Sequence, residues 1–244
     1  MEQQIFQKEY SIREILFESW RLFKENFQLI LIVTLIVYIP INIILCFIPT
    51  ETLFEQNGLL QGFTDYIRIV QILEELIGII ATMAIAFIIK SKLDGNIINY
   101  KMALKKSFSR WAPAIWTNIL LGLLLLGLFL LLIIPGIIYA VYWMFTLYAV
   151  VLYDKSGKDA LNYSKNVVKG RWWKVFCYSL VFGILSLVVG IATGIPSWFL
   201  PESFFLTIIS DVFIDVVASF FTVVFAVFFI NLDSTKTAKV QAGV

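Results

Sequence analysis

Long apolar segments alternate with short amphipathic segments along the chain. Four apolar segments of 18 to 23 residues carry at most one charged side chain each: 27–49, 112–134, 136–153 and 174–195. About 20 apolar residues cross the bilayer core as a helix, so each segment predicts a membrane span. Two weaker spans are expected at 70–90 and 210–232, where acidic residues interrupt the apolar pattern. The pattern therefore predicts an all-α membrane protein with six transmembrane helices in one domain, 1–244.

The third and fourth spans belong to one uncharged stretch, residues 112–153. As a single helix these 42 residues would extend about 63 Å, twice the thickness of the hydrocarbon core. Pro135 disfavours helix in the residue before it, and Gly136 permits a tight reversal. We therefore expect a helical hairpin that turns at Pro135-Gly136.

Basic residues are distributed asymmetrically between the two sides of this topology. The segments before the first span, after the second, after the fourth and after the sixth hold 18 of the 19 Lys and Arg, and the opposite side holds only Arg68. Cytoplasmic loops are enriched in Lys and Arg, so we expect both termini in the cytoplasm. The first 26 residues also carry five acidic side chains, and we expect no cleaved signal peptide.

Three amphipathic segments, 11–26, 96–111 and 156–170, precede the first, third and fifth spans. Ser11 with Glu14, and Ser156 with Asp159, have the spacing of a helix capping box. The expected apolar stripes are Ile12, Ile15, Leu16, Ser19, Leu22 and Phe23; Ile97, Tyr100, Leu104, Phe108 and Trp111; and Leu161, Ser164, Val167 and Val168. We expect three cytoplasmic interfacial helices, in three pseudo-repeats of interfacial helix plus helical hairpin.

Composition narrows the chemistry that the chain can perform. Apolar residues make up 60% and charged residues 15%, the net charge is +2, and histidine is absent. Without histidine, His-assisted nucleophiles and His metal sites are excluded. We expect no enzyme activity, no cofactor, no metal and no nucleic-acid binding, and we expect Cys46 and Cys177 to be small core residues.

One stretch of the chain resembles a known family. The residues that carry the resemblance are Leu132 to Ile138 around Pro135-Gly136, Tyr142-Trp143, Ala160-Leu161, Ser164, Lys169-Gly170, Trp172-Trp173 and Val175-Phe176. They look like the membrane domain of some glycerophosphoryl diester phosphodiesterases and of related stand-alone bacterial membrane proteins. The resemblance implies a multi-pass protein of a bacterial cell membrane. In the phosphodiesterases a separate barrel with histidines carries the catalysis, so no catalytic residue is expected here.

Basic and aromatic residues gather at the cytoplasmic ends of the spans. Such clusters bind anionic headgroups, with about 1 kcal/mol from each basic group. The candidate headgroup-binding residues are Lys105, Lys106, Arg110, Trp111, Lys169, Arg171, Trp172, Trp173 and Lys174. Alternatively, these residues are only the positive-inside bias and aromatic belt of any such protein.

Acidic residues inside spans form a second candidate site: Glu74, Glu75, Asp211 and Asp215. Ionisable groups in hydrocarbon are costly and often mark an ion or substrate path, although these four could equally lie at the membrane boundary. Asn42 and Asn118 are further polar residues within spans, which we expect to bond across helices.

Two functions remain open at this point. One is a lipid-engaging scaffold or accessory factor that binds anionic membrane lipids and another membrane protein. The alternative is a small transporter, permease component, or export or resistance factor for a lipid, peptide or cation, which would use the acidic residues. The sequence leaves the oligomeric state open.

Overall fold

The computed structural model describes residues 6, 8–48, 61–62, 64–65, 67–199 and 203–241, and every regular element in these ranges is helical. Six helical segments are long and apolar enough to cross a membrane: Phe27–Cys46, Ile67–Leu93, Trp111–Leu131, Ile133–Tyr153, Trp172–Gly194 and Phe204–Ala238. The predicted all-α, multi-pass architecture is therefore confirmed. The second and sixth spans are longer than predicted, and residue 49 lies outside the described residues.

The spans pair into three hairpins, each preceded by a short helix. Helix α1 (Ile12–Glu25) precedes α2 (Phe27–Cys46) and the span that contains η1 (Glu74–Gly78) and α4 (Ile79–Leu93). The second set is α5 (Tyr100–Ser109), α6 (Trp111–Leu131), α7 (Ile133–Trp143) and α8 (Thr146–Tyr153), and the third is α9 (Gly157–Val168), α10 (Trp172–Gly194) and α11 (Phe204–Gln241), with the short η2 (Ile195–Phe199) between the last two. That these sets are copies of one repeat stays a prediction.

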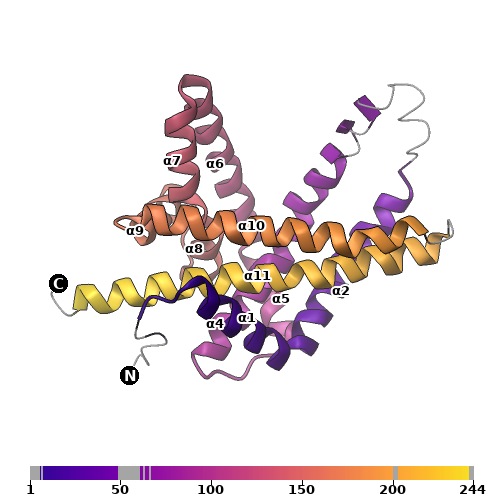
Figure 1. The fold of residues 1–244 in the computed structure, drawn as a ribbon, viewed down its shortest axis with the longest axis horizontal. Coiled ribbons are helices and arrows are strands. Elements are labelled where there is room, and N and C mark those ends of the chain that lie inside the picture. Colours follow the sequence, from indigo (N-terminus) through magenta and orange to yellow (C-terminus); the bar gives the residue numbers. More distant parts are fainter. Residues whose placement is uncertain are drawn as a thin grey trace.

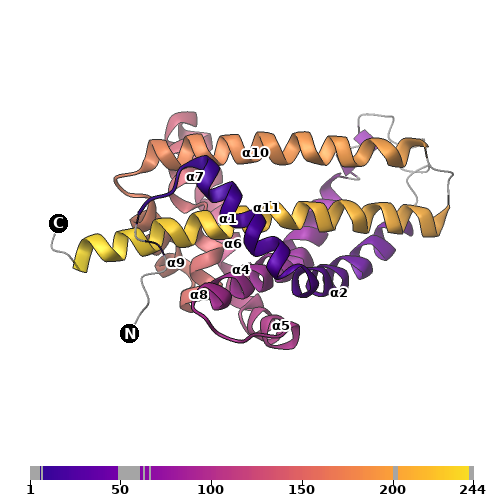
Figure 2. The ribbon, with the colours of Figure 1, turned by 60° about the horizontal axis from the view of Figure 1, so that its bottom comes forward.

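The three hairpins diverge from one junction, which we define as α1, α5, α8, α9 and residues 220–241 of α11. Figure 1 shows the α6–α7 hairpin rising from this junction, whereas α10 and α11 extend to the side. Figure 2 keeps α10 and α11 side by side after rotation. Helix α11 contacts α1, α2, α4 and α10, so it is the central element of the fold.

Aromatic side chains fill the core of the junction. Phe145 directly before α8, Phe182 of the adjoining α10 and Phe228 of α11 are fully buried. The Phe228 ring centroid lies 5.5 Å from that of Phe145 and 5.7 Å from that of Phe182, both edge to face. Such pairs contribute about 0.5–1.5 kcal/mol beyond their buried area. This cluster joins the second and third hairpins.

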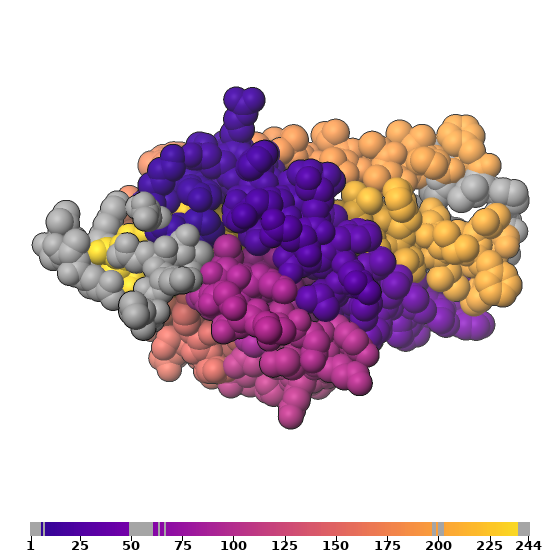
Figure 3. Space-filling view, turned by 90° about the horizontal axis from the view of Figure 1, so that it is seen from below, coloured from indigo at the N-terminus to yellow at the C-terminus, as the bar shows by residue number. Residues whose placement is uncertain are grey.

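Helix α1 begins as predicted and packs its apolar face against the protein. The Ser11 hydroxyl accepts the N–H of Glu14 at 3.3 Å, and the Glu14 carboxylate accepts the N–H of Ser11 at 2.8 Å, which completes the capping box. Ile15, Leu22 and Phe23 are buried, and α1 contacts α11. Figure 3 shows α1 covering this face of the junction beside α4 and α5.

The turn of the second hairpin differs from the prediction. Helix α6 ends at Leu131, Leu132 is extended with φ −158° and ψ 132°, and α7 begins at Ile133. Pro135 and Gly136 therefore lie in the first turn of α7. The N–H groups in the first turn of a helix have no acceptor within the helix, so proline, which lacks an N–H, fits there without breaking the helix. Gly136 instead allows close approach, because a Cβ there would lie 2.5 Å from Cδ1 of Phe129.

The predicted second capping box does not form. Ser156 makes no side-chain bond to the start of α9, and Gly157 has φ +53°. The N–H of Gly157 instead donates to Thr117 Oγ1 of α6 at 2.8 Å. A contact distant in sequence therefore replaces the local cap. Gly170 follows α9 with a left-handed φ of +86°, a conformation that glycine adopts readily at the end of a helix.

Helix α5 packs only part of its predicted apolar stripe against the core. Asn99 caps it by accepting the N–H of Met102 at 2.9 Å, a signal that the sequence analysis missed. Ala103 and Ser107 are buried, and Tyr100 and Leu104 of the predicted stripe pack against the core. Phe108 and Trp111 of the same stripe are exposed, as is Ile97, which precedes the helix. That α1, α5 and α9 lie in a membrane interface stays a prediction.

Candidate functional site

The acidic pair of the last span meets α2. Asn42 Nδ2 of α2 donates to Asp215 Oδ2 of α11 at 2.8 Å, between residues 173 positions apart. Asn42 is buried. Asp211 lies one turn from Asp215 on the same helix, and both Asp211 and Glu74 add negative potential at Asp215. The structure therefore brings three of the four predicted acidic residues together.

Both glutamates of the second span lie at the start of a π-helix, Glu74–Gly78. Glu75 Oε2 accepts Asn118 Nδ2 of α6 at 3.1 Å, so this side chain joins the first and second hairpins. The backbone carbonyl of Leu76 accepts Trp111 Nε1 at 2.5 Å. A π-turn leaves a carbonyl without its usual i+4 partner, and the Trp111 indole satisfies one here. Glu75 therefore bonds to α6, whereas the acidic residues that act on Asp215 are Glu74 and Asp211.

A small polar cavity lies between α2, α4 and α11, beside Asp215. Its volume is about 30 Å³, room for about one or two water molecules. The lining residues are Tyr38, Ala81, Thr82, Ile85, Asp215, Ala218, Ser219 and Thr222. The polar residues among them carry hydroxyl or carboxylate groups, whose oxygens can accept hydrogen bonds from water or coordinate a hard cation.

The first basic cluster is largely paired within the protein. Asp154 lies 2.6 Å from Lys106 Nζ and 3.0 Å from Arg110 Nε. The hydrogen bond from Lys106 and the charge of Arg110 lower the pKa of Asp154. Asp154 has the left-handed φ of 55° that ends α8. These two basic side chains therefore hold the loop after α8 against α5.

The second basic cluster attaches the N-terminal segment. Arg171 Nη1 donates to Glu9 Oε1 at 3.1 Å and to Thr235 Oγ1 at 3.0 Å. Its Nη2 donates to the carbonyls of Val167 at 2.9 Å and Leu232 at 2.8 Å. Lys174 Nζ donates to Glu9 Oε2 at 3.0 Å. Arg171 thus connects the N-terminal segment, α9 and α11, which is a structural role.

The remaining members of the predicted headgroup site differ in exposure. Trp172 Nε1 donates to the carbonyl of Ile138 at 3.0 Å and is held against α7. Trp173 is 72% exposed. Lys105 and Lys169 are exposed and make no ion pair within the described part of the chain. Lys105, Lys169 and Trp173 are therefore exposed to the surroundings, and Trp111 is 39% exposed.

The outward face of α1 carries a similar pattern that the sequence analysis did not select. Phe17 is 72% and Trp20 49% exposed, and Lys24 Nζ lies 5.6 Å from the Trp20 ring centroid. Arg13 is also exposed. It lies on the same face of α1, because residues 13, 17, 20 and 24 are three or four positions apart. The available signal in the sequence was this second stripe of aromatic and basic residues, which alternates with the buried apolar stripe of α1.

Buried polar residues of α11 near its end were also missed. Asn231 Oδ1 accepts the N–H of Tyr10 at 2.9 Å, and Asn231 Nδ2 donates to the carbonyl of Lys8 at 2.9 Å. Asp233 accepts the hydroxyls of Tyr153 and, at 2.8 Å, Tyr163. Asn231, Asp233 and Thr235 are all buried. Polar residues at alternate positions around the end of the predicted last span, 210–232, were the available signal.

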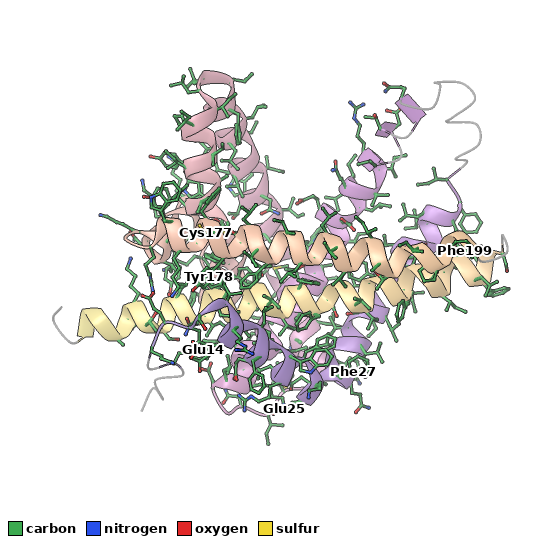
Figure 4. The ribbon with its side chains drawn as sticks, in the orientation of Figure 1. Glu14, Glu25, Phe27, Cys177, Tyr178 and Phe199 are labelled. Carbon is green, nitrogen blue, oxygen red and sulfur yellow. The ribbon has the colours of Figure 1, made fainter. Side chains whose placement is uncertain are left out.

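The cysteines have no shared role. Cys46 is half-buried and Cys177 is exposed, so the expectation of a core position is wrong for Cys177. Tyr178 faces α11, where its ring centroid lies 5.5 Å from that of Phe228 (Figure 4). Within the described residues, no group of three or more His, Cys, Asp or Glu side chains could hold a metal ion.

Comparison with known proteins gives one match. Residues 76–232 match a family described as a domain of unknown function, DUF7847. The match begins in η1, includes all of α4 to α10 and ends within α11, so it covers more than half of the chain. No curated protein and no solved structure matches the chain. The resemblance to the phosphodiesterase membrane domain stays a prediction, since the matched family carries no such description.

Proposed function

The chain belongs to the DUF7847 family, a domain of unknown function, and we propose that it is a non-enzymatic multi-pass membrane protein that binds anionic phospholipid. In this proposal it acts as a scaffold or accessory factor of a membrane complex. Its termini face the cytoplasm of a bacterial cell, because 18 of the 19 basic residues lie on the side of the termini.

The exposure of the spans carries this proposal. Only 11% of the residues in the most apolar windows of α6 and α10 are buried. The second and third hairpins diverge instead of packing along their lengths (Figure 1). Apolar helices without protein neighbours contact acyl chains, so lipid occupies the space between these hairpins.

In this proposal, lipid headgroups are bound by exposed basic side chains that form no ion pair within the described residues. Lys105 lies on α5 three residues before Phe108, which is 59% exposed, and Lys169 lies four residues before the exposed Trp173. A lysine beside an interfacial aromatic ring pairs with a phosphate while the ring lies at the headgroup level. Arg13 and Lys24 of α1 flank exposed rings in the same way.

A reconstitution experiment with defined lipid tests this proposal. The full chain is placed in nanodiscs of phosphatidylcholine and phosphatidylglycerol, and native mass spectrometry measures which lipid it retains on release. For wild type we expect preferential retention of phosphatidylglycerol. Lys105→Gln combined with Lys169→Gln removes two headgroup contacts of about 1 kcal/mol each, so the preference falls about 30-fold.

The matched control changes net charge equally at other exposed positions. Lys92 and Lys158 are exposed and have no aromatic residue within four positions. Lys92→Gln combined with Lys158→Gln is expected to keep most of the preference. Equal losses of lipid preference in the two double variants would show that the preference depends on net charge and not on these positions. An unchanged preference in the Lys105 and Lys169 variant would refute the proposed headgroup site.

A further inference from the structure

The polar cavity beside Asp215 is not explained by lipid binding. It lies between three membrane-spanning elements, with Tyr38 from α2, Thr82 from α4, and Asp215, Ser219 and Thr222 from α11. Five polar side chains around a space that holds about one or two water molecules are unusual in a span whose other residues are apolar. The cavity therefore calls for a polar occupant.

The charge around Asp215 identifies the class of that occupant. Within the described residues, its carboxylate has one hydrogen-bond donor, Asn42, and no basic partner. The titratable groups that face it are Tyr38 of α2, Glu74 of η1 and Asp211 of its own helix, and none of them is basic. A carboxylate in an apolar region needs a neutralising proton or cation, and the neighbouring acids strengthen that need.

We propose that this cavity is a binding site for one monovalent cation, a proton or Na⁺, held by Asp215. Tyr38, Thr82 and Thr222, which each carry a hydroxyl group, line the same space. Hydroxyls have acceptor lone pairs in addition to their proton, so they can coordinate Na⁺ or accept a hydrogen bond from a water or hydronium ion.

Helix α11 closes the site toward the junction. From Val223 to Ile230 its residues are apolar, and all of them except Phe225 are fully buried. The polar residues of α11 therefore end where this buried apolar stretch begins; they are Asp211, Asp215, Ser219 and Thr222. The cation consequently enters from the hairpin tips, and the arrangement is a one-sided binding site instead of a continuous channel.

The Na⁺ and proton sources can be distinguished by carbodiimide labelling. A membrane-permeable carbodiimide reacts with a protonated carboxyl group: the proton moves to nitrogen, the carboxyl oxygen adds to the central carbon, and the adduct keeps the whole reagent mass. The full chain in phosphatidylcholine vesicles is treated between about pH 5 and about pH 9, with and without about 100 mM Na⁺, and adducts are located by mass spectrometry. An SDS-denatured aliquot serves as the labelling control.

We expect labelling of Asp215 in the folded chain that falls at least tenfold as pH rises over this range. Suppression by Na⁺ at constant pH, without suppression by choline, assigns Na⁺ as a competing ligand, and no effect of Na⁺ assigns the proton alone. Either result supports the site. Labelling of Asp215 that does not change with pH, or its absence at every pH while the denatured aliquot is labelled, would overturn it.

Variants separate the site from general effects on folding. Tyr38→Phe removes one lining hydroxyl but keeps the ring that contacts Gly78, so the pH at half-labelling should shift and any Na⁺ protection should weaken severalfold. Asp94→Asn changes an acidic residue that pairs with Lys90 at 2.6 Å outside the cavity, and its profile should equal that of wild type. Identical profiles for Tyr38→Phe and wild type would contradict the proposed ligand set.

Discussion

Arg171 offers the sharpest test of how the junction is held together. Its guanidinium makes four hydrogen bonds to three separate parts of the chain, and its side chain is only 12% exposed. Arg171→Lys keeps the positive charge, but a single ammonium cannot reach two acceptors on either side. Loss of two charge-assisted bonds at about 1.5 kcal/mol each lowers the free energy of unfolding by about 3 kcal/mol. The melting temperature should then fall by about 6–12 °C.

Thermal unfolding of the full chain in detergent measures this loss, and hydrogen exchange locates it. We expect faster exchange at Tyr10, whose N–H is bonded to Asn231, because Glu9 loses its guanidinium partner. Arg13→Lys makes the same chemical change at an exposed position of α1 and should shift stability by less than about 0.5 kcal/mol. An equal melting temperature for Arg171→Lys and Arg13→Lys would show that the hydrogen bonds of Arg171 do not stabilise the junction.

Two further predictions concern the second hairpin and the start of α1. Gly136→Ala places a Cβ 2.5 Å from the Phe129 ring, so we expect thermal unfolding to show a free energy of unfolding lower by about 1–3 kcal/mol. Adding Phe129→Ala should restore part of this stability. No loss in Gly136→Ala would show that α6 and α7 are not in close contact. The hydrogen bond from Lys8 lowers the pKa of Glu14 from 4.5 to about 2, so its contribution is complete above about pH 4.5 and disappears as pH falls toward about 2. Hydrogen exchange at the start of α1 should rise across that window in wild type but not in Glu14→Gln, and the same pH dependence in both would exclude Glu14 as the cause.

The spans could be predicted from the sequence because bilayer thickness imposes a length on each apolar segment. Helix α2 begins at the predicted residue, and the capping box of α1 forms as its spacing indicated. Both features depend on residues close together in the chain. The turn near Pro135 could not be predicted in the same way, because proline fits the first turn of a helix as well as the end of one.

The partners of the polar residues could not be found from the sequence. Arg171 and Glu9 are 162 positions apart, and Asn42 and Asp215 are 173 apart. Sequence spacing correctly selected Asp215 as a candidate but gave no reason to join it to α2. It also grouped Arg171 with Lys169, although Arg171 is partly buried in the junction and Lys169 is exposed at the surface.

Selection of anionic phospholipid by this membrane protein can be measured in the lipid that surrounds the wild-type chain. The full chain is extracted with its surrounding bilayer into polymer-bounded discs, and the headgroups in these discs are quantified against those of the same bulk membrane. We expect anionic phospholipid to be enriched severalfold in the discs. A headgroup composition equal to that of the bulk membrane would contradict the account.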